Sequence, residues 1–199
     1  KCGKGVCKLI YMKMLNKFES PLTELVRKWQ KYFPDITEQI LSSCFVSLYE
    51  ITPCSHTQHF QFKLMHRILA TNEKLHMFNI VESDLCEFCM EEIETLNHIF
   101  LECEAIKPFW KDIQFWIAQK LNVNISVELI SIMLGIDYGN DQVMKIICKI
   151  YLAAKQYVYK CRCTKQFPSI SNCVSYKKTI KQIEKCFSKF KDIWSQILL

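Results

Sequence analysis

Three cysteines and one histidine in a short stretch of the chain have the residue types and the spacing of a zinc site. They follow the pattern Cys86-x2-Cys89-x8-His98-x4-Cys103. Closed structural zinc sites take four thiolate or imidazole ligands arranged as a tetrahedron. We therefore predict a structural Zn²⁺ bound by Cys86, Cys89, His98 and Cys103, which fastens a loop that has little apolar core of its own.

A chance arrangement of cysteines is the alternative interpretation. The chain contains 12 cysteines, and the close pair of Cys161 and Cys163 shows that such pairs arise without the rest of a zinc pattern. The presence of His98 and Cys103 at ligand spacing in the same window favours zinc. We interpret the remaining cysteines as small buried apolar residues or free thiols.

The segment around these ligands is strongly acidic. It has no Lys or Arg between residues 82 and 104, and its acidic residues are Glu82, Asp84, Glu87, Glu91, Glu92, Glu94, Glu102 and Glu104. Three thiolates around one Zn²⁺ add further negative charge, so the approach of a phosphate costs Coulomb repulsion. We therefore predict that the segment is a structural clamp and not the surface that contacts nucleic acid.

The C-terminal part of the chain has the opposite charge. The formal net charge is +6, yet residues 142–199 contain 12 Lys and Arg against 2 Asp and Glu. Such an asymmetry points to a polyanionic partner. A helix over residues 173–198 places four lysines on one face opposite an apolar face, namely Lys178, Lys181, Lys185 and Lys189. A solvated face without a binding role is the alternative.

A second basic face is predicted nearer the middle of the chain. If residues 57–70 form one helix, His59, Lys63, His66 and Arg67 lie opposite its apolar residues. Gln61 is the only polar residue on the apolar side. For this helix also, an ordinary solvated face is the alternative.

The composition indicates an all-α fold. With 4 Gly and 5 Pro, the chain has too few turn residues for a β-sandwich or barrel, and its 50% apolar content excludes a wholly disordered chain. We predict an irregular multi-helix domain with a small Cys3His knuckle-like insert. Its regions are an N-terminal helical part (1–56), core helices (57–120) that carry the knuckle (86–103), and a basic C-terminal helical part (121–199).

Several sequence signals predict where the helices begin and end. Asp35 and Glu38 are spaced as a capping box at the start of a helix. Asn140 or Asp141 is expected to cap a long helix that reaches about residue 161. Gly135 is expected to end a short helix that begins near residue 126.

The order of these motifs resembles the C-terminal region of LINE-type non-LTR retrotransposon reverse transcriptases. The resemblance is carried by residues 60–76, 86–89, 94–103 and 108–110, and it extends to residues 20–29. Such proteins reverse-transcribe their own RNA at a nicked chromosomal target, and this part of them is a helical nucleic-acid-binding appendage. The resemblance implies that the Cys3His residues are zinc ligands. It also implies that Lys63, His66 and Arg67 belong to the family's helix motif.

One departure from the family pattern concerns the knuckle loop. Relatives often carry Arg or Lys in the Cys-to-His loop, where this chain has Glu91 and Glu92. This difference argues against a direct role of the loop in RNA contact.

The main functional hypothesis is a nucleic-acid-binding segment of such a reverse transcriptase, whose partners are RNA, DNA and the rest of the parent enzyme. The predicted contacts are Lys63, His66, Arg67, Lys145, Lys149, Lys160, Arg162, Lys178, Lys181, Lys185 and Lys189. The alternative is a co-opted or remnant helical module that docks a protein through its aromatic faces and keeps zinc as a structural ion. A continuous cationic surface favours nucleic acid, whereas dispersed cations beside an open apolar patch favour a protein partner.

The chain carries no recognisable catalytic motif. A polymerase needs clustered carboxylates to hold two metal ions, but the aspartates here are scattered and no two are adjacent. Neither a phosphate-binding loop nor a nucleophile elbow occurs. We predict that this segment is not an enzyme by itself, although its presumed parent is an RNA-directed DNA polymerase.

The start of the chain and its hydropathy give an expectation for location. The chain begins at Lys1, which suggests a piece of a longer polypeptide, and Lys1, Lys4, Lys8 and Lys13 interrupt any signal-peptide core. No apolar run is long enough for a membrane span. We expect an intracellular protein of the nucleus or cytoplasm with no membrane partner.

Overall fold

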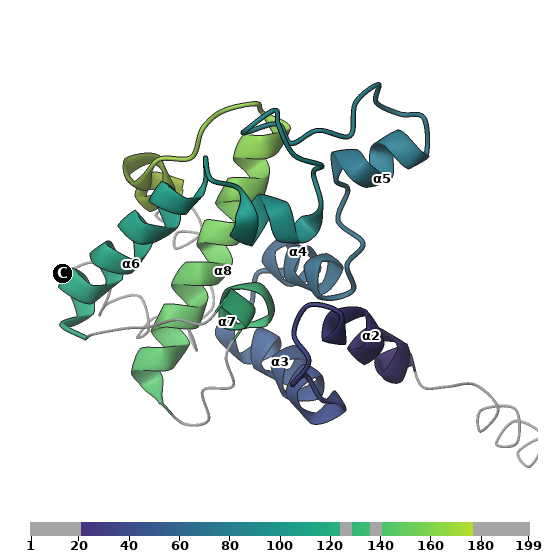
Figure 1. Ribbon diagram of the computed structural model, residues 1–199. Helices are drawn as coiled ribbons and strands as arrows, with labels where there is room; N and C mark the ends of the chain where they lie inside the picture. The colour runs from purple at the N-terminus through teal and green to yellow at the C-terminus, as the bar shows by residue number, and fades with distance from the viewer. Residues whose placement is uncertain (1–20, 124–128, 136–140, 177–199) are drawn as a thin grey trace, which may run out of the picture. The chain divides into compact units, whose positions relative to one another are not determined.

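The computed structural model describes residues 21–123, 129–135 and 141–176, and these residues are mainly helical (Figure 1). Within these ranges the only β-type pairing is one antiparallel bridge between Leu85 and Ile93. The prediction of an all-α fold with a Cys3His insert is therefore confirmed. The lysines predicted on the last helix, Lys178, Lys181, Lys185 and Lys189, lie outside the described residues.

The chain forms two compact units that meet at Ser43 and Cys44. In the described part of the first unit, α2 (Pro21–Gln30) buries Leu25, Val26 and Trp29. The Trp29 ring is fully buried and stacks on Phe33, with 6.2 Å between ring centroids. This aromatic pair gives the unit a local core.

The next helix, α3, spans Glu38–Ile51. With Asp35 as the N-cap, the predicted helix would begin at residue 36, two residues before the observed start. The residue immediately before it is Thr37, whose hydroxyl accepts a hydrogen bond from the Ile40 amide at 3.3 Å. Asp35 therefore does not cap this helix, and the capping-box prediction is wrong. Thr is also among the preferred N-cap residues, and Thr37 stands next to the first helical residue.

The second unit is organised around one long helix, α8 (Gln142–Cys163), which Figure 1 draws among its other helices. Residues 146–158 of α8 are buried on nearly every side, and the helix packs against α4 (Ser55–Met65) and α7 (Leu129–Leu134). Asp141 caps α8 as predicted, because its Oδ1 accepts hydrogen bonds from the amides of Val143 at 2.8 Å and Met144 at 3.2 Å. The described residues of this unit also form α5 (Asn72–Met77), α6 (Lys107–Leu121) and the part of α3 from Cys44 onward.

Helix α4 is shorter than the predicted segment 57–70. The chain turns at Arg67, which has a left-handed φ of 56°, and the Ile68 amide bonds to the Lys63 carbonyl at 2.8 Å. Together with the bond from the Arg67 amide to the Leu64 carbonyl, this is a Schellman ending. Arg67 is therefore not on the same helical face as Lys63, and Ile68 is 57% exposed instead of joining the core.

The polar residue on the apolar side of α4 has a structural role. Gln61 is buried, and its amide group donates to the Met133 carbonyl of α7 at 2.9 Å. Lys155 of α8 donates from Nζ to the Gln61 side-chain oxygen at 2.7 Å and to the Met133 carbonyl at 3.0 Å. Because Lys155 is 2% exposed, burial lowers its pKa to about 7. These bonds join α4, α7 and α8 through one interior contact.

The buried ammonium of Lys155 gives a testable pH dependence. An unfolded lysine has a pKa of 10.5, so between pH 7 and about pH 10 the unfolded chain binds more protons at this site than the folded chain. This site should raise the free energy of unfolding with pH, by up to about 1.4 kcal/mol per pH unit. Lys155→Met should remove this slope, as measured by denaturant unfolding at several pH values with zinc in excess.

The exposed Lys111 of α6 provides the control for this experiment. Lys111→Met should keep the pH dependence of the unmodified chain. If Lys155→Met also leaves the dependence unchanged, the interior lysine does not titrate in the folded protein.

Candidate metal centre

Two short turns bring the first two cysteines together at the tip of a hairpin. The Cys86 amide donates to the Glu92 carbonyl at 2.8 Å, and the Met90 amide donates to the Cys86 carbonyl at 2.9 Å. Met90 has a left-handed φ of 58°, which reverses the chain directly after Cys89. This geometry holds Cys86 and Cys89 close to each other.

The other two ligands lie at the two ends of a single π-helical turn, η1 (His98–Glu102). The turn begins where the His98 amide bonds to the Thr95 hydroxyl at 3.0 Å. It closes with a bond from the Cys103 amide to the His98 carbonyl at 2.9 Å. Cys103 thus follows the imidazole by one wide turn, and π-helical turns of this kind are frequent at functional sites.

The four side chains fit one tetrahedral zinc ion. Their ligand atoms all lie within 4.8 Å of one another. Sγ of Cys86 is 3.9 Å from Sγ of Cys103, and Sγ of Cys89 is 3.3 Å from Nε2 of His98. Zn–S and Zn–N bonds of ordinary length place tetrahedral ligand atoms about 3.5 to 3.8 Å apart. The prediction that these residues come together around one position therefore agrees with the geometry.

The three thiols of the cluster differ in the direction in which their surroundings shift the pKa. Burial raises the pKa of Cys86 to about 12, although the amides of Cys89 and Phe88 act in the opposite direction. Burial also raises the pKa of Cys103. For Cys89 the effect of burial is outweighed by hydrogen bonds from the amides of Glu91 and Glu92, and its pKa is lowered. Zinc binding must release the protons of the buried thiols, so affinity should fall as the pH falls.

Comparison with known protein families identifies the segment that contains these ligands. Residues 27–110 match the family described as zinc-binding in reverse transcriptase, and all four ligands lie inside the match. This segment of the chain is therefore similar to a zinc-binding domain associated with reverse transcriptase. Zinc is accordingly the metal that the Cys3His site of this domain is positioned to bind. A search of curated proteins found no match for the chain.

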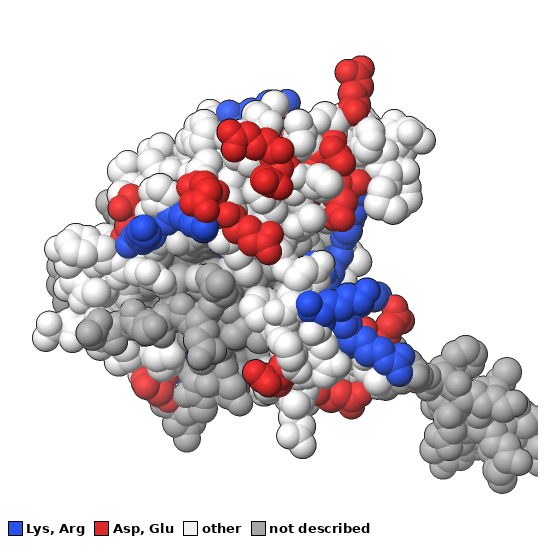
Figure 2. Space-filling model, in the orientation of Figure 1, with Lys and Arg blue, Asp and Glu red and all other residues white. Residues whose placement is uncertain are grey.

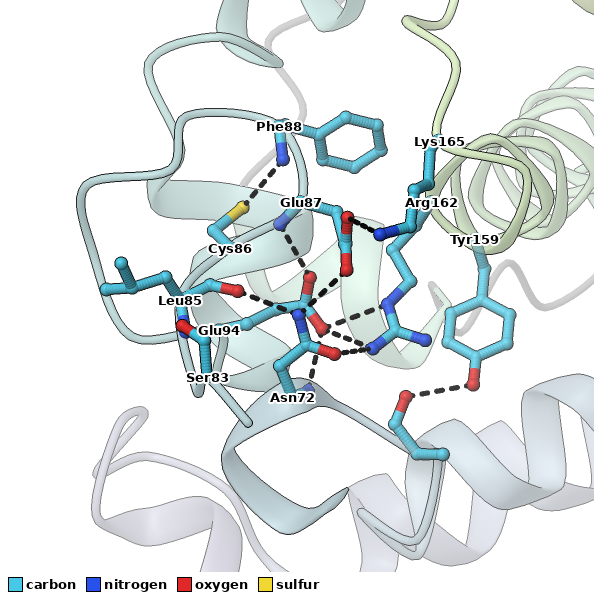
Figure 3. A network of polar contacts seen from close by, with 11 residues as sticks. Asn72, Ser83, Leu85, Cys86, Glu87, Phe88, Glu94, Tyr159, Arg162 and Lys165 are labelled. Atoms are coloured by element: carbon cyan, nitrogen blue, oxygen red, sulfur yellow. Dashed lines mark hydrogen bonds and ion pairs between the residues drawn. The ribbon is translucent and has the colours of Figure 1, made fainter. Parts of the chain in front are cut away.

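A buried ion pair connects the zinc-binding domain to α8 (Figure 3). Glu94, which lies between the two ligand pairs, is fully buried, and Oε1 accepts from Arg162 Nε at 2.9 Å and Nη2 at 2.7 Å. The same oxygen accepts from the Asn72 amide at 2.7 Å, and Oε2 accepts from the Glu87 amide at 3.0 Å. Every oxygen of this carboxylate therefore has a partner, as a buried charge requires.

Asn72 and Glu87 extend this network around the ion pair. Asn72 is the first residue of α5, and its Nδ2 donates to the Leu85 carbonyl at 2.8 Å and to Glu87 Oε1 at 3.2 Å. Its Oδ1 accepts from Arg162 Nη2. Lys165 pairs with Glu87 Oε2 at 3.2 Å. The hairpin next to Cys86 is thereby fixed to both α5 and the C-terminal end of α8.

The position of Arg162 corrects one sequence expectation. Arg162 was expected to contact nucleic acid, but it is 8% exposed and its guanidinium is committed to Glu94 and Asn72. Lys149 is 3% exposed and also lies in the interior of the unit. These two residues carry positive charge on a helix that is surrounded by protein, so they do not form a surface for phosphates.

The other predicted nucleic-acid contacts that the structure describes all belong to the second unit, and they differ in exposure and partners. Lys145 is half-buried near the start of α8, and Arg67 donates from Nη1 to Asn97 Oδ1 at 3.1 Å. His66 is half-buried against Phe62, with 4.2 Å between ring centroids. Lys63 and Lys160 are brought together, because both line one hollow between α4 and α8.

The acidic residues of the knuckle segment divide into two groups. Glu94 is buried and Glu87 is half-buried in the network, whereas the majority of the others are exposed, for example Glu82, Glu91 and Glu102. Figure 2 shows acidic side chains gathered over the upper part of the face it displays, with Lys and Arg in smaller separate groups. The surface near the knuckle is therefore poorly suited to phosphate contact.

Sequence analysis missed the roles of Glu94 and Asn72. Glu94 is one of eight acidic residues between positions 82 and 104, and nothing in that run distinguishes a buried carboxylate from an exposed one. Its partner Arg162 lies 68 residues further along the chain. The pairing depends on the packing of α8 against the domain and leaves no local signal.

Proposed function

We propose that this chain is the non-catalytic, nucleic-acid-binding C-terminal segment of a LINE-type reverse transcriptase. The observation that carries the proposal is that the Cys3His cluster falls inside the match to a zinc-binding domain of reverse transcriptase. The order of the motifs within and beside the match, including residues 20–29 and 108–110, supports the LINE type. RNA, DNA and the remainder of the enzyme are the partners that this assignment implies.

In this proposal the two halves of the segment have different tasks. The acidic zinc-binding hairpin braces the fold through Glu94 and Arg162 and does not contact phosphates. Cations on other surfaces, among them Lys63 and Lys160, neutralise the backbone of the nucleic acid and read little of its sequence. Polymerase chemistry is left to the rest of the parent enzyme, because this chain has no adjacent pair of aspartates.

A second candidate function is supported by an exposed apolar cluster. Met77, Phe78 and Ile80 lie close together in sequence at and just after the end of α5, and they are 74%, 72% and 66% exposed. Apolar side chains grouped in this way are typical of surfaces that dock a protein. This cluster suits a contact with another part of the parent enzyme or with a separate protein.

No helix in the described part of the chain is long and apolar enough to cross a bilayer.

The salt dependence of binding tests the proposed function. If about six cations meet phosphates, the affinity for nucleic acid should fall roughly 10³-fold between 50 and 200 mM salt, because bound counterions are released. Fluorescence anisotropy of a labelled RNA strand, titrated with the whole chain at both salt concentrations, measures this change. An absence of binding at low salt, or an affinity that does not respond to salt, would count against nucleic-acid binding and favour the protein-docking alternative.

A further inference from the structure

The hollow between α4 and α8 has the composition of a nucleotide site. It is lined by His56, His59, Phe60 and Lys63 from α4, by Gln156, Tyr159 and Lys160 from α8, and by Leu69 and Tyr176. Its volume is about 470 Å³, within the range of sites that hold small organic ligands. Four of these residues can carry positive charge, and none is acidic. This contrasts with the acidic surface around the knuckle.

The cationic groups of the hollow are available to an anion. Lys160 and His59 are exposed and Lys63 is half-buried. Among the described residues, no carboxylate forms an ion pair with these three side chains. The side-chain amide nitrogen of Gln156 lies 2.7 Å from His56 Nδ1, so this imidazole is held in place at the hollow. The hollow therefore presents several donors and two ammonium groups to a phosphate.

The aromatic groups of the hollow are held in place before any ligand binds. The Tyr159 hydroxyl donates to the Ala70 carbonyl at 2.9 Å, and the ring packs against the buried Phe60 with 5.8 Å between centroids. The Arg162 guanidinium lies 6.0 Å from the Tyr159 ring centroid. Lys160 Nζ lies 5.2 Å from the centroid of Tyr176, which also lines the hollow. A fixed ring next to an ammonium group can hold a base and its phosphate together at low entropic cost.

We propose that this hollow binds one nucleotide unit of a single-stranded nucleic acid, with its phosphate at Lys63 and Lys160 and its base against Tyr176. The proposal rests on the proposed function and specifies the form of nucleic acid that binds. A duplex keeps its bases stacked inside the helix, so it offers phosphates to the lysines but no free base to Tyr176. A single strand offers both.

The test compares a labelled oligothymidine strand with a duplex of the same length, each titrated into the whole chain by fluorescence anisotropy. Tyr176→Ala should weaken binding of the single strand by roughly 5- to 150-fold, the value of one stacked base, and should leave duplex binding unchanged. Tyr176→Phe retains the ring and should bind both probes as the unmodified chain does. Lys160→Ala should weaken both probes and lower the salt slope by about one phosphate contact.

Further arms separate the possible failures of this proposal. Lys111→Ala, on α6 and outside the hollow, should change neither probe. If the unmodified chain binds neither strand nor duplex, the proposed function itself fails. If it binds both and Tyr176→Ala affects them equally or not at all, the hollow does not hold a base and only this inference is overturned. Competition by thymidine monophosphate as strong as that by the strand would make the hollow a site for free nucleotides, which also contradicts the inference.

Discussion

A Cys86→Ser chain is expected to lose the stabilisation that zinc provides to the unmodified protein. Zinc that binds only the folded state stabilises it by RT ln(1 + [Zn²⁺]/Kd), so a thousandfold excess over Kd contributes about 4 kcal/mol. Replacing one of four ligands removes a thiolate from a cluster whose atoms lie within 4.8 Å of one another. The free energy of unfolding should therefore rise with buffered free zinc in the unmodified chain and change little in the variant. Chemical unfolding at several zinc concentrations measures this difference.

Cys163→Ser is the matched control for this substitution. This variant also replaces one cysteine by serine, but Cys163 is exposed and does not belong to the ligand cluster. Its variant should depend on zinc as the unmodified chain does. Equal loss of zinc dependence in both variants would mean that the stabilising metal is held elsewhere.

Arg162→Met is expected to destabilise the chain by about 3 to 5 kcal/mol, because it leaves the charge of Glu94 buried without its counterion. The side chains of this pair are 9% and 0% exposed, so water cannot replace the lost partner. Two backbone amides still reach Glu94, and they compensate only in part. Denaturant unfolding of the zinc-loaded variant measures the change in the free energy of unfolding.

Lys165→Met tests whether the effect belongs to the buried pair or to the network in general. Lys165 pairs with Glu87, but its side chain is 75% exposed, and exposed pairs contribute at most about 1 kcal/mol. We expect a change of that size or less. If Arg162→Met were as mild as Lys165→Met and instead weakened nucleic-acid binding, Arg162 would be a surface contact after all.

The zinc ligands could be predicted from sequence because they are close together in it. Cys86 and Cys103 are 17 residues apart, and the residue types and spacing within that window define the chemistry. The caps at Asp141 and Gly135 were also predictable, since each depends on the residues next to it. Local signals of this kind describe single helices and turns accurately.

Reasoning from local sequence failed where burial and helix ends depend on the packing of distant segments. Acid-free stretches such as residues 142–183 look like solvated cationic faces, but α8 lies in the interior of its unit and buries Lys149, Lys155 and Arg162. The end of α4 could not be predicted from a glycine, since the residue that adopts the left-handed conformation there is Arg67. A helical wheel cannot report either effect.

The zinc centre, the buried ion pair and the hollow are connected through neighbouring residues. Glu94 lies between the ligand pairs, Arg162 joins it to α8, and the Arg162 guanidinium lies near the ring of Tyr159 in the hollow. Binding of zinc thus stabilises the hairpin that holds this end of α8 in place. Under the function we propose, the acidic zinc-binding hairpin would support nucleic-acid binding by positioning α8, without contacting phosphates itself.

The zinc content of the purified chain tests the central claim most directly. Elemental analysis after expression with zinc and removal of loosely bound metal should find one zinc per unmodified chain and per Cys163→Ser chain. It should find much less than one in Cys86→Ser. A metal-free unmodified chain, or a Cys86→Ser chain that retains full zinc, would contradict the assignment of Cys86, Cys89, His98 and Cys103 as the zinc site.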